Sequence, residues 1–330
     1  MIKHIGATLF AFLIIIPALF AGERYERIYV FGDSLSDNGN LATITGPLPE
    51  PPYFQNRITN GLTAVDVLAG KLGLPLEASL HLIGPAVGAN YAVAGASAET
   101  HGSIDLTSQV ALFLANHGGV APDDALYVMF LGGNDIRHAR DSGDATQAAQ
   151  IVADATGVIN TQMQVLAMAG ARNWLVVNAP DIGAIPETGL IAATIGDISL
   201  PAKVSALSQQ FNVALHAQIE QLEDELDIEV EDFDLFAEFN QIINTSVSLG
   251  FTNNSDACFS SLLGQFNPGC NFGLSFGEYV FFDEIHPTAG VHAMIGERMF
   301  AEIAEHDAGD RRKGTHKEKH RKKRQHHEKD

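Results

Sequence analysis

Basic residues are scarce over most of this 330-residue chain. Ten of its 20 lysines and arginines lie between Arg311 and Lys329, which leaves ten basic residues against 37 acidic ones before that segment. An acidic body repels polyanions, so the composition argues against a nucleic-acid groove in the globular part. We expect no nucleic-acid partner.

Long apolar runs are absent after the first 21 residues. Residues 1–21 hold Lys3, an apolar stretch from Ile5 to Phe20, and the small Ala21 before a charged residue. This pattern predicts a signal peptide cleaved after Ala21, and hence a secreted or periplasmic protein. An uncleaved N-terminal anchor is the alternative, although the stretch is short for a membrane span.

The chain has only two cysteines, Cys258 and Cys270, and they lack the histidine spacing of a zinc site. It also contains no His-Glu-x-x-His, Walker A or dinucleotide-binding fingerprint, so we expect no metal and no other cofactor. Export would place both cysteines in an oxidising compartment. We therefore predict a disulfide that closes a short loop and stabilises the fold by roughly 3 kcal/mol.

Between Tyr25 and His306, short apolar runs of strand length alternate with longer runs of helical length. The predicted strands cover Arg27–Phe31, Ala125–Leu131, Trp174–Asn178 and Ile228–Phe233, and the predicted helices cover Thr146–Ala169 and Val204–Leu226, with a last helix beginning at Pro287. Strands that alternate with helices predict a parallel sheet covered on both faces. We therefore expect residues 22–308 to form one α/β domain, a three-layer α/β/α sandwich with a mainly parallel sheet.

Two stretches of the predicted domain are rich in loop-forming residues. Gly46–Tyr53 is rich in proline, and Phe251–Gly277 is rich in asparagine, glycine and serine. Long loops in a compact domain often frame a binding site, so we expect both stretches to be surface loops of that kind.

The segment 309–330 is strongly basic and contains no apolar residue that could pack against a core. We expect it to be a disordered tail. Such a tail could contact an anionic cell envelope or fold back on the acidic body.

Ser34 directly follows the first predicted strand, in the stretch Gly32-Asp33-Ser34-Leu35. A serine at a strand-to-helix turn has its hydroxyl at the carboxyl edge of the sheet, where ligands of α/β proteins bind. This position favours Ser34 as a nucleophile. The alternative is that Ser34 only caps the next helix, the role that we expect for Asp37 or Asn38.

A serine nucleophile needs a base, and the base needs an acid that holds it in one tautomer. Asp283 and His286 follow an apolar run, Tyr279–Phe282, and are separated by three residues. That separation can place the Asp283 carboxylate beside one imidazole nitrogen and leave the other free to face Ser34. The other histidines of the body lack an aspartate in this arrangement at a strand end.

Acyl transfer also needs hydrogen-bond donors for the oxyanion. Asn134 follows the apolar strand that ends at Leu131, so its side-chain amide could reach the same sheet edge. Gly95 lies in a turn of small residues, where a backbone N–H can approach a substrate closely. We expect the N–H groups of Ser34 and Gly95 and the Asn134 amide to form the oxyanion hole.

These residues resemble the Ser, Gly, Asn and His blocks of the GDSL esterase/lipase family within the SGNH hydrolases. The blocks map in order onto Ser34, Gly95, Asn134 and His286, with Asp283 as the acid, and the similarity extends from about Ile28 to Phe300. Two further stretches, Asn56–Gly61 and Ala171–Pro180, also resemble the family, although Ile58 replaces an aromatic residue and the basic tail has no counterpart. The resemblance implies an SGNH-like fold with flavodoxin-like strand order.

The resemblance also implies a secreted, monomeric serine esterase or lipase that cleaves lipid or short acyl esters through an acyl-enzyme, with possible transfer of the acyl group to an alcohol. Two alternatives stay open: a carbohydrate acetyl esterase and a non-catalytic surface-binding protein. Ser275 fits a Gly-x-Ser-x-Gly nucleophile elbow. However, an apolar strand-like run follows it instead of the helix that an elbow requires, so we do not assign it as the nucleophile.

Overall fold

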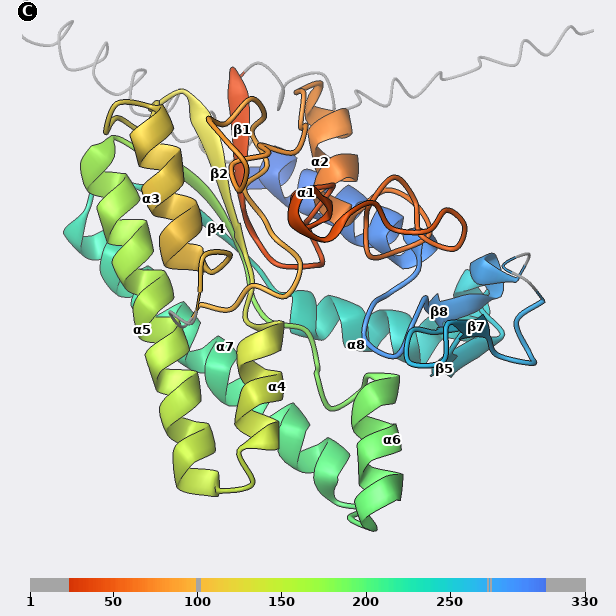
Figure 1. Cartoon of the computed structure of the whole chain (residues 1–330). Helices are drawn as coiled ribbons and strands as arrows, with labels where there is room; N and C mark the ends of the chain where they lie inside the picture. Colours follow the sequence, from red (N-terminus) through yellow and green to blue (C-terminus); the bar gives the residue numbers. More distant parts are fainter. Residues whose placement is uncertain (1–23, 99–101, 272, 274, 307–330) are drawn as a thin grey trace, which may run out of the picture.

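The computed structural model describes residues 24–98, 102–271, 273 and 275–306 (Figure 1). The predicted signal peptide, residues 1–21, and the basic tail, residues 309–330, lie outside these described residues. Among the described residues, no helix combines the length and the apolar character needed to cross a bilayer.

A parallel sheet forms the centre of the described chain. Its strands lie in the order β1 (Arg27–Gly32), β2 (Ala125–Phe130), β3 (Asn173–Val177) and β4 (Glu229–Phe233). The segment around Asn90 extends the sheet beyond β1, because the N–H of Val30 donates to the Ala89 carbonyl at 3.1 Å and the N–H of Tyr91 donates to the Val30 carbonyl at 2.7 Å. The segment around Asn90, which is second in the sequence, therefore lies at the edge of the sheet next to β1. This is the predicted flavodoxin-like order.

Helices cover both faces of this sheet (Figure 1). One face carries α3 (Leu106–Asn116), α5 (Ala145–Ala169) and α7 (Leu200–Glu225). The other carries α2 (Ala64–Leu72) and the helix 289–306. These two approach so closely that a Cβ atom on Gly296 would lie 2.5 Å from the Ala64 carbonyl oxygen. The predicted three-layer sandwich is confirmed.

The strands are apolar runs because both faces of the sheet are covered. All six residues of β2 are buried, and β1 is exposed only at Arg27. The predicted strands agree with the observed ones to within one residue at each end. The predicted helices fall inside α5 and α7, apart from the last residue assigned to α7, Leu226, which follows its end.

The carboxyl ends of the strands lead into a second group of helices. Gly132 connects β2 to α4 (Gly133–Asp141), and α6 (Pro186–Ile195) and α8 (Leu235–Thr245) follow β3 and β4. Together with the turn after β1 and the short helix α1 (Ala42–Thr45), these connections form one edge of the sandwich. Functional side chains from distant parts of the sequence can meet there.

The second predicted loop region contains more structure than expected. It contains β5 (Asn253–Ala257), which pairs with β8 (Tyr279–Phe281), and a hairpin of β6 (Phe259–Ser260) and β7 (Gln265–Phe266). In the sequence, the short 3-10 helix η3 (Ser246–Leu249) precedes β5 and η4 (Phe276–Glu278) precedes β8. The predicted disulfide between Cys258 and Cys270 is present and joins the two ends of the hairpin region. The run before Asp283 is thus a strand, but it belongs to this small sheet and not to the central one.

The predicted start of the last helix at Pro287 is wrong by two residues. The helix covers residues 289–306, and the Thr288 carbonyl accepts its first hydrogen bond, from the N–H of His292. Pro287 instead pairs with Phe281 in an isolated bridge, and its carbonyl accepts a hydrogen bond from Thr59 Oγ1 at 2.9 Å. A tertiary contact therefore keeps Pro287 extended.

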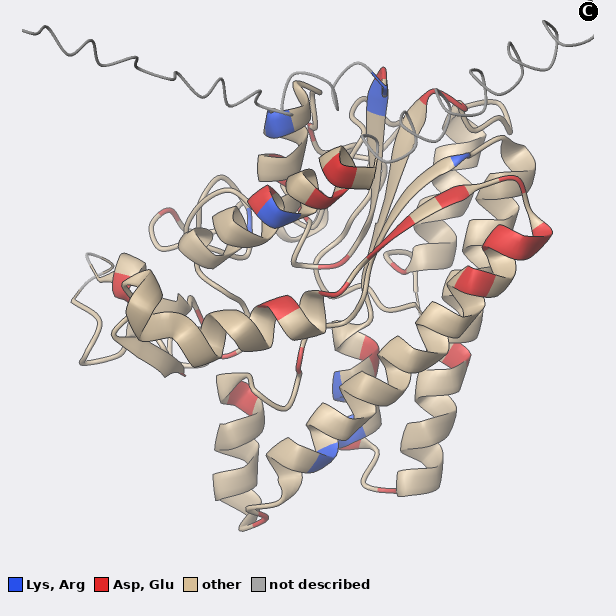
Figure 2. Ribbon diagram, turned by 180° about the vertical axis from the view of Figure 1, so that it is seen from behind, with Lys and Arg blue, Asp and Glu red and all other residues tan. Residues whose placement is uncertain are grey.

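Acidic residues dominate the charged positions in the view of Figure 2. They are spread over several helices and over β4, which carries Glu229, Glu231 and Asp232. The few lysines and arginines in this view are scattered among them. The acidic excess in the sequence is thus a property of the folded domain as a whole.

Gly132 gives a test of how tightly the sheet edge is packed. Its φ is +128°, and a Cβ atom there would lie 2.5 Å from the Phe211 ring. We expect Gly132→Ala to lower the free energy of unfolding by roughly 2–4 kcal/mol, because strain and overpacking add. Urea denaturation measures this, and Gly157→Ala, in the middle of α5 with open space around it, serves as the control that should not destabilise.

Candidate active site

Ser34 lies in a tight turn directly after β1. The Asp33 carbonyl accepts hydrogen bonds from the N–H groups of Ser36 and Asp37, at 3.1 and 2.9 Å, and α1 begins only at Ala42. The predicted strand-to-helix turn is therefore a strand followed by a turn, and Ser34 caps no helix. This geometry leaves the half-buried Ser34 side chain at the carboxyl edge of the sheet.

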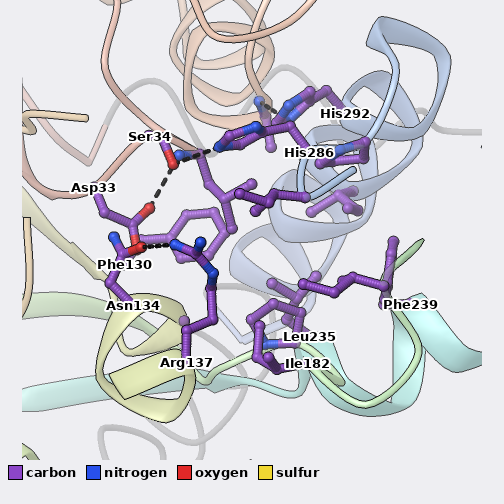
Figure 3. Close-up of a pocket in the computed structure, with 18 residues that line it drawn as sticks. Asp33, Ser34, Phe130, Asn134, Arg137, Ile182, Leu235, Phe239, His286 and His292 are labelled. Atoms are coloured by element: carbon purple, nitrogen blue, oxygen red, sulfur yellow. Dashed lines mark hydrogen bonds between the residues drawn. The ribbon is translucent and has the colours of Figure 1, made fainter. Parts of the chain in front are cut away.

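His286 connects Ser34 to Asp283 (Figure 3). Ser34 Oγ lies 2.8 Å from His286 Nε2, and His286 Nδ1 lies 2.9 Å from both carboxylate oxygens of Asp283. Asp283 Oδ1 also accepts the backbone N–H groups of Ile285 at 2.9 Å and His286 at 2.7 Å. The carboxylate is buried and can only accept, so the imidazole carries its proton on Nδ1 and presents the lone pair of Nε2 to Ser34.

The Asn56–Gly61 stretch fixes the segment that follows His286. Asn60 Oδ1 accepts the N–H of Ala289 at 2.9 Å, next to the bond from Thr59 to the Pro287 carbonyl. A Cβ atom on Gly61 would lie 2.6 Å from the Ala289 Cβ, so only glycine allows this approach. The stretch therefore holds the His286 loop in place from the other side of the site.

The donors expected for the oxyanion are the backbone N–H groups of Ser34 and Gly95 and the Asn134 amide. Gly95 has a φ of +87°, a conformation that glycine adopts without strain, and Asn134 lies in the first turn of α4. Within the described residues, the backbone N–H groups of Ser34 and Gly95 donate to no protein acceptor. One N–H of the Asn134 amide donates to the Ala96 carbonyl at 2.8 Å, which leaves the second N–H without a protein acceptor.

Two buried aspartates hold the Gly95 segment on both sides. Asp37 accepts the N–H of Ala94 at 2.8 Å, and Asp135 accepts the N–H of Ala98 at 3.0 Å. Asp37 also accepts three N–H groups of its own turn. The predicted role of Asp37 as a helix cap is wrong, because α1 has no side-chain cap and the carboxylate instead joins its own turn to the Gly95 segment.

Asn38 does not cap a helix. Its side-chain amide donates to the Asp66 carboxylate at 3.1 Å and to the Leu76 carbonyl at 2.8 Å. Asn40, like Asp37, binds the segment that carries Gly95, because its amide donates to the carbonyls of Asn90 at 2.8 Å and Ala92 at 2.7 Å. The stretch after Ser34 therefore holds the segment that carries Gly95 in place through side-chain hydrogen bonds.

A pocket opens beside Ser34. Its polar groups lie at one end, where Ser34, Asn134 and His286 meet, and Figure 3 shows Ile182, Leu235 and Phe239 on the opposite side. Most of the remaining lining is apolar and comes from five sources: the turn after β1, β2, the loop before α6, the His286 loop and the helix 289–306 (Leu35, Phe130, Pro180, Ile185, Ile285, Ile295). The cavity can hold an apolar chain attached to a group that reacts with Ser34.

Other candidate groups lie elsewhere or are already engaged. Ser275 precedes η4 and β8, so it has no strand before it and no α-helix after it, as expected for a serine that is not in a nucleophile elbow. His216 does contact an aspartate, Asp232, at 2.6 Å, but this pair is on the exposed surface of α7. Within the described residues, no group of three or more metal-ligating side chains occurs.

Comparisons with known proteins identify the family of this chain. The sequence model of the family described as GDSL-like Lipase/Acylhydrolase matches residues 28–299. The chain belongs to this family. The match covers all five residues that the sequence analysis assigned to the site, and it places the chain among hydrolases of the esterase/lipase type that act on carboxylic esters.

Relatives of known name resemble this GDSL-family chain to different extents. Lipase 1 of Photorhabdus luminescens is 32% identical over 52% of this chain, which spans only 25% of that protein. The phosphatidylcholine-sterol acyltransferase of Aeromonas hydrophila is 25% identical over 86% of this chain and 91% of its own length. Among solved structures, an acetylxylan esterase of Geobacillus stearothermophilus aligns with a TM-score of 0.45 and 13% identity, over 84% of this chain and 94% of that one.

Two buried titratable groups of this GDSL-family site have shifted pKa values. Burial lowers the pKa of His292 to about 3, with a smaller contribution from His286, and its Nδ1 accepts the N–H of Ala64 at 3.2 Å. His292 is therefore neutral and structural. Burial raises the pKa of Asp33 to about 6, although the N–H of Leu35 and the charges of His286 and Arg137 oppose this shift.

The raised pKa of Asp33 predicts a pH-dependent stability. The folded protein holds this proton more tightly than the unfolded chain, where the pKa is 3.8, so the stabilisation is complete below that pH and is lost as the pH rises through 6. Between pH 4 and pH 7 we expect the wild type to lose about 2 kcal/mol of unfolding free energy relative to Asp33→Asn. Urea denaturation at both pH values measures it, and parallel pH dependences of the two proteins would contradict it.

Proposed function

We propose that this protein is a serine esterase or lipase in which Ser34 is the nucleophile, His286 the general base and Asp283 the acid that orients it. The observation that carries the proposal is the 2.8 Å contact between Ser34 Oγ and His286 Nε2, with Asp283 bound to the opposite ring nitrogen. A merely structural histidine has no need for a serine at a sheet edge beside an open cavity. The same contact disfavours a non-catalytic surface-binding protein.

The reaction follows from the positions of these groups. His286 Nε2 takes the proton of Ser34 as Oγ attacks the ester carbonyl, and the resulting imidazolium is stabilised by the Asp283 carboxylate. The imidazolium then gives the proton to the departing alkoxide, which leaves an acyl group on Ser34. His286 next takes a proton from water, the hydroxide attacks the acyl carbon, and Ser34 recovers its proton as the acid is released.

The oxyanion that forms when Ser34 attacks needs hydrogen-bond donors. The N–H groups of Ser34 and Gly95 and the second N–H of Asn134 would bind it, a role that their lack of protein acceptors supports. The apolar cavity beside Ser34 would take the acyl chain, which supports lipid or short acyl esters as substrates. Trp174, the single tryptophan, is buried in β3 and offers no stacking platform for a sugar, so the carbohydrate acetyl esterase is the weaker candidate.

An alcohol could replace water as the group that attacks the acyl-enzyme, because the proton transfers are the same. The similarity to an enzyme named phosphatidylcholine-sterol acyltransferase supports this second outcome for the acyl group. We further propose that the protein is exported and works as a monomer. The disulfide between Cys258 and Cys270 supports an oxidising compartment.

The decisive variant is Ser34→Ala. We expect it to fold with wild-type stability and to lose hydrolysis of p-nitrophenyl butyrate by at least about a thousandfold, because no other group can form the acyl-enzyme. The matched control is Ser275→Ala, which removes the serine of the false elbow motif and should keep full activity. Hydrolysis that survives in Ser34→Ala and disappears in Ser275→Ala would overturn the proposal.

Phe239 offers a test of the acyl site. It lines the cavity opposite Ser34, so Phe239→Leu should lengthen the space for the acyl chain. We expect kcat/KM for longer p-nitrophenyl esters to rise relative to the acetate, by about fourfold for each additional methylene that becomes buried. The control is Phe113→Leu, a buried phenylalanine of α3 outside the cavity, which should reduce stability and leave the chain-length preference unchanged. An unchanged preference in Phe239→Leu would place the acyl chain elsewhere.

A further inference from the structure

Arg137 contacts the side chain of Asn134 from the next turn of α4. Its Nη1 donates to Asn134 Oδ1 at 3.0 Å, and Figure 3 shows the guanidinium between the apolar end of the cavity and Asn134. Nε and Nη2 of the same guanidinium donate to the two carboxylate oxygens of Glu187, at 2.8 and 2.6 Å. Such a bidentate pair fixes the plane and the direction of the guanidinium. The contact to Asn134 is therefore made by a rigidly held group.

The cation selects one orientation of the Asn134 amide. A half-turn of the amide would exchange oxygen and nitrogen and direct two N–H donors at another donor. In the observed orientation, Arg137 donates to the amide oxygen of Asn134 and the Ala96 carbonyl accepts one of its N–H groups. A single N–H of the amide is therefore left for the cavity. A positive charge at the amide oxygen also polarises the amide, which makes this N–H a stronger donor.

Glu187 is itself held on several sides. Its carboxylate accepts Arg140 Nη1 at 2.8 Å, and its backbone N–H donates to the Glu284 carbonyl at 2.8 Å. Hydrogen bonds from Arg137 and Arg140 lower its pKa despite its partial burial, so it remains an anion in mildly acidic solution. Through this one residue, α6 joins the Asn134 side of the site to the loop that carries Asp283 and His286.

From this arrangement we infer that Arg137 is a positioning residue for the oxyanion hole, held by Glu187 and acting through the Asn134 amide. The inference rests on the proposed function, since it assumes that Asn134 binds the oxyanion. Its specific content is that Arg137 affects the transition state only through Asn134. Binding of the ground-state ester should hardly depend on it, because the oxyanion exists only after attack by Ser34.

A double-mutant cycle of Arg137→Met and Asn134→Ala tests this with p-nitrophenyl butyrate. We expect Arg137→Met to lower kcat by about tenfold to a hundredfold with KM changed less than about threefold, because misdirecting one oxyanion donor should cost less than the hundredfold to thousandfold seen when a donor is removed. In the Asn134→Ala background, Arg137→Met should change kcat by less than about twofold, because its target is gone. Glu187→Gln, which keeps the shape of the partner and weakens its hold, should lower kcat less than Arg137→Met.

The control is Arg298→Met, which removes a half-exposed arginine paired with Glu302 on the last helix and should leave kcat unchanged. Thermal unfolding of every variant separates loss of fold from loss of rate, and Arg137→Lys provides a cation of similar length if Arg137→Met folds poorly. Partial recovery of kcat in Arg137→Lys over Arg137→Met supports the inference.

Two results would overturn it. One is an equal loss of kcat from Arg137→Met with and without Asn134, which would mean that Arg137 acts by another route. The other is normal kcat in Arg137→Met. If Asn134→Ala alone keeps full activity, both the oxyanion role of Asn134 and this inference fail, whereas the nucleophile is judged separately from Ser34→Ala.

Discussion

The hydrogen bond between Ser34 and His286 joins two side chains that are 252 residues apart in the sequence. It can form only because a parallel sheet brings the carboxyl ends of its strands to one edge, while the last segment returns to that edge from outside the sheet. That return depends on the β5–β8 pair, on the contacts of Thr59 and Asn60 with residues 287 and 289, and on the packing of the helix 289–306 against α2. The site thus lies where the beginning and the end of the domain's sequence come into contact.

Sequence reasoning predicted local arrangements best. The three-residue separation of Asp283 and His286 indicated that the carboxylate lies beside one imidazole nitrogen, and the structure shows this contact, with Ser34 at the other nitrogen. The central strands were also predictable, because a sheet covered on both faces requires continuous apolar runs. These features depend on local patterns, and local patterns are what a single sequence displays.

The remaining features depend on partners that no local pattern reveals. The three residues of β8 read as a strand, but nothing in them distinguishes the central sheet from a small separate one. Asp37 has the spacing of a turn or a cap, and its bond to Ala94, 57 residues away, becomes visible only in three dimensions. Arg137 and Glu187 lie on α4 and α6, 50 residues apart, and no local pattern indicates that they pair.

Several carboxylates are buried around Ser34, where the proposed mechanism places an oxyanion. Asp33, Asp37, Asp135 and Asp283 all lie within the core around Ser34, and each accepts at least one backbone N–H. These bonds place the turn after β1, the Gly95 segment and the His286 loop, but their charges oppose a negative charge on the substrate. In the proposed mechanism, the positive ends of backbone and amide dipoles have to outweigh these charges at short range. The direction of the Asn134 N–H is then important, and the Arg137 guanidinium, which Glu187 holds, fixes that direction in the structure.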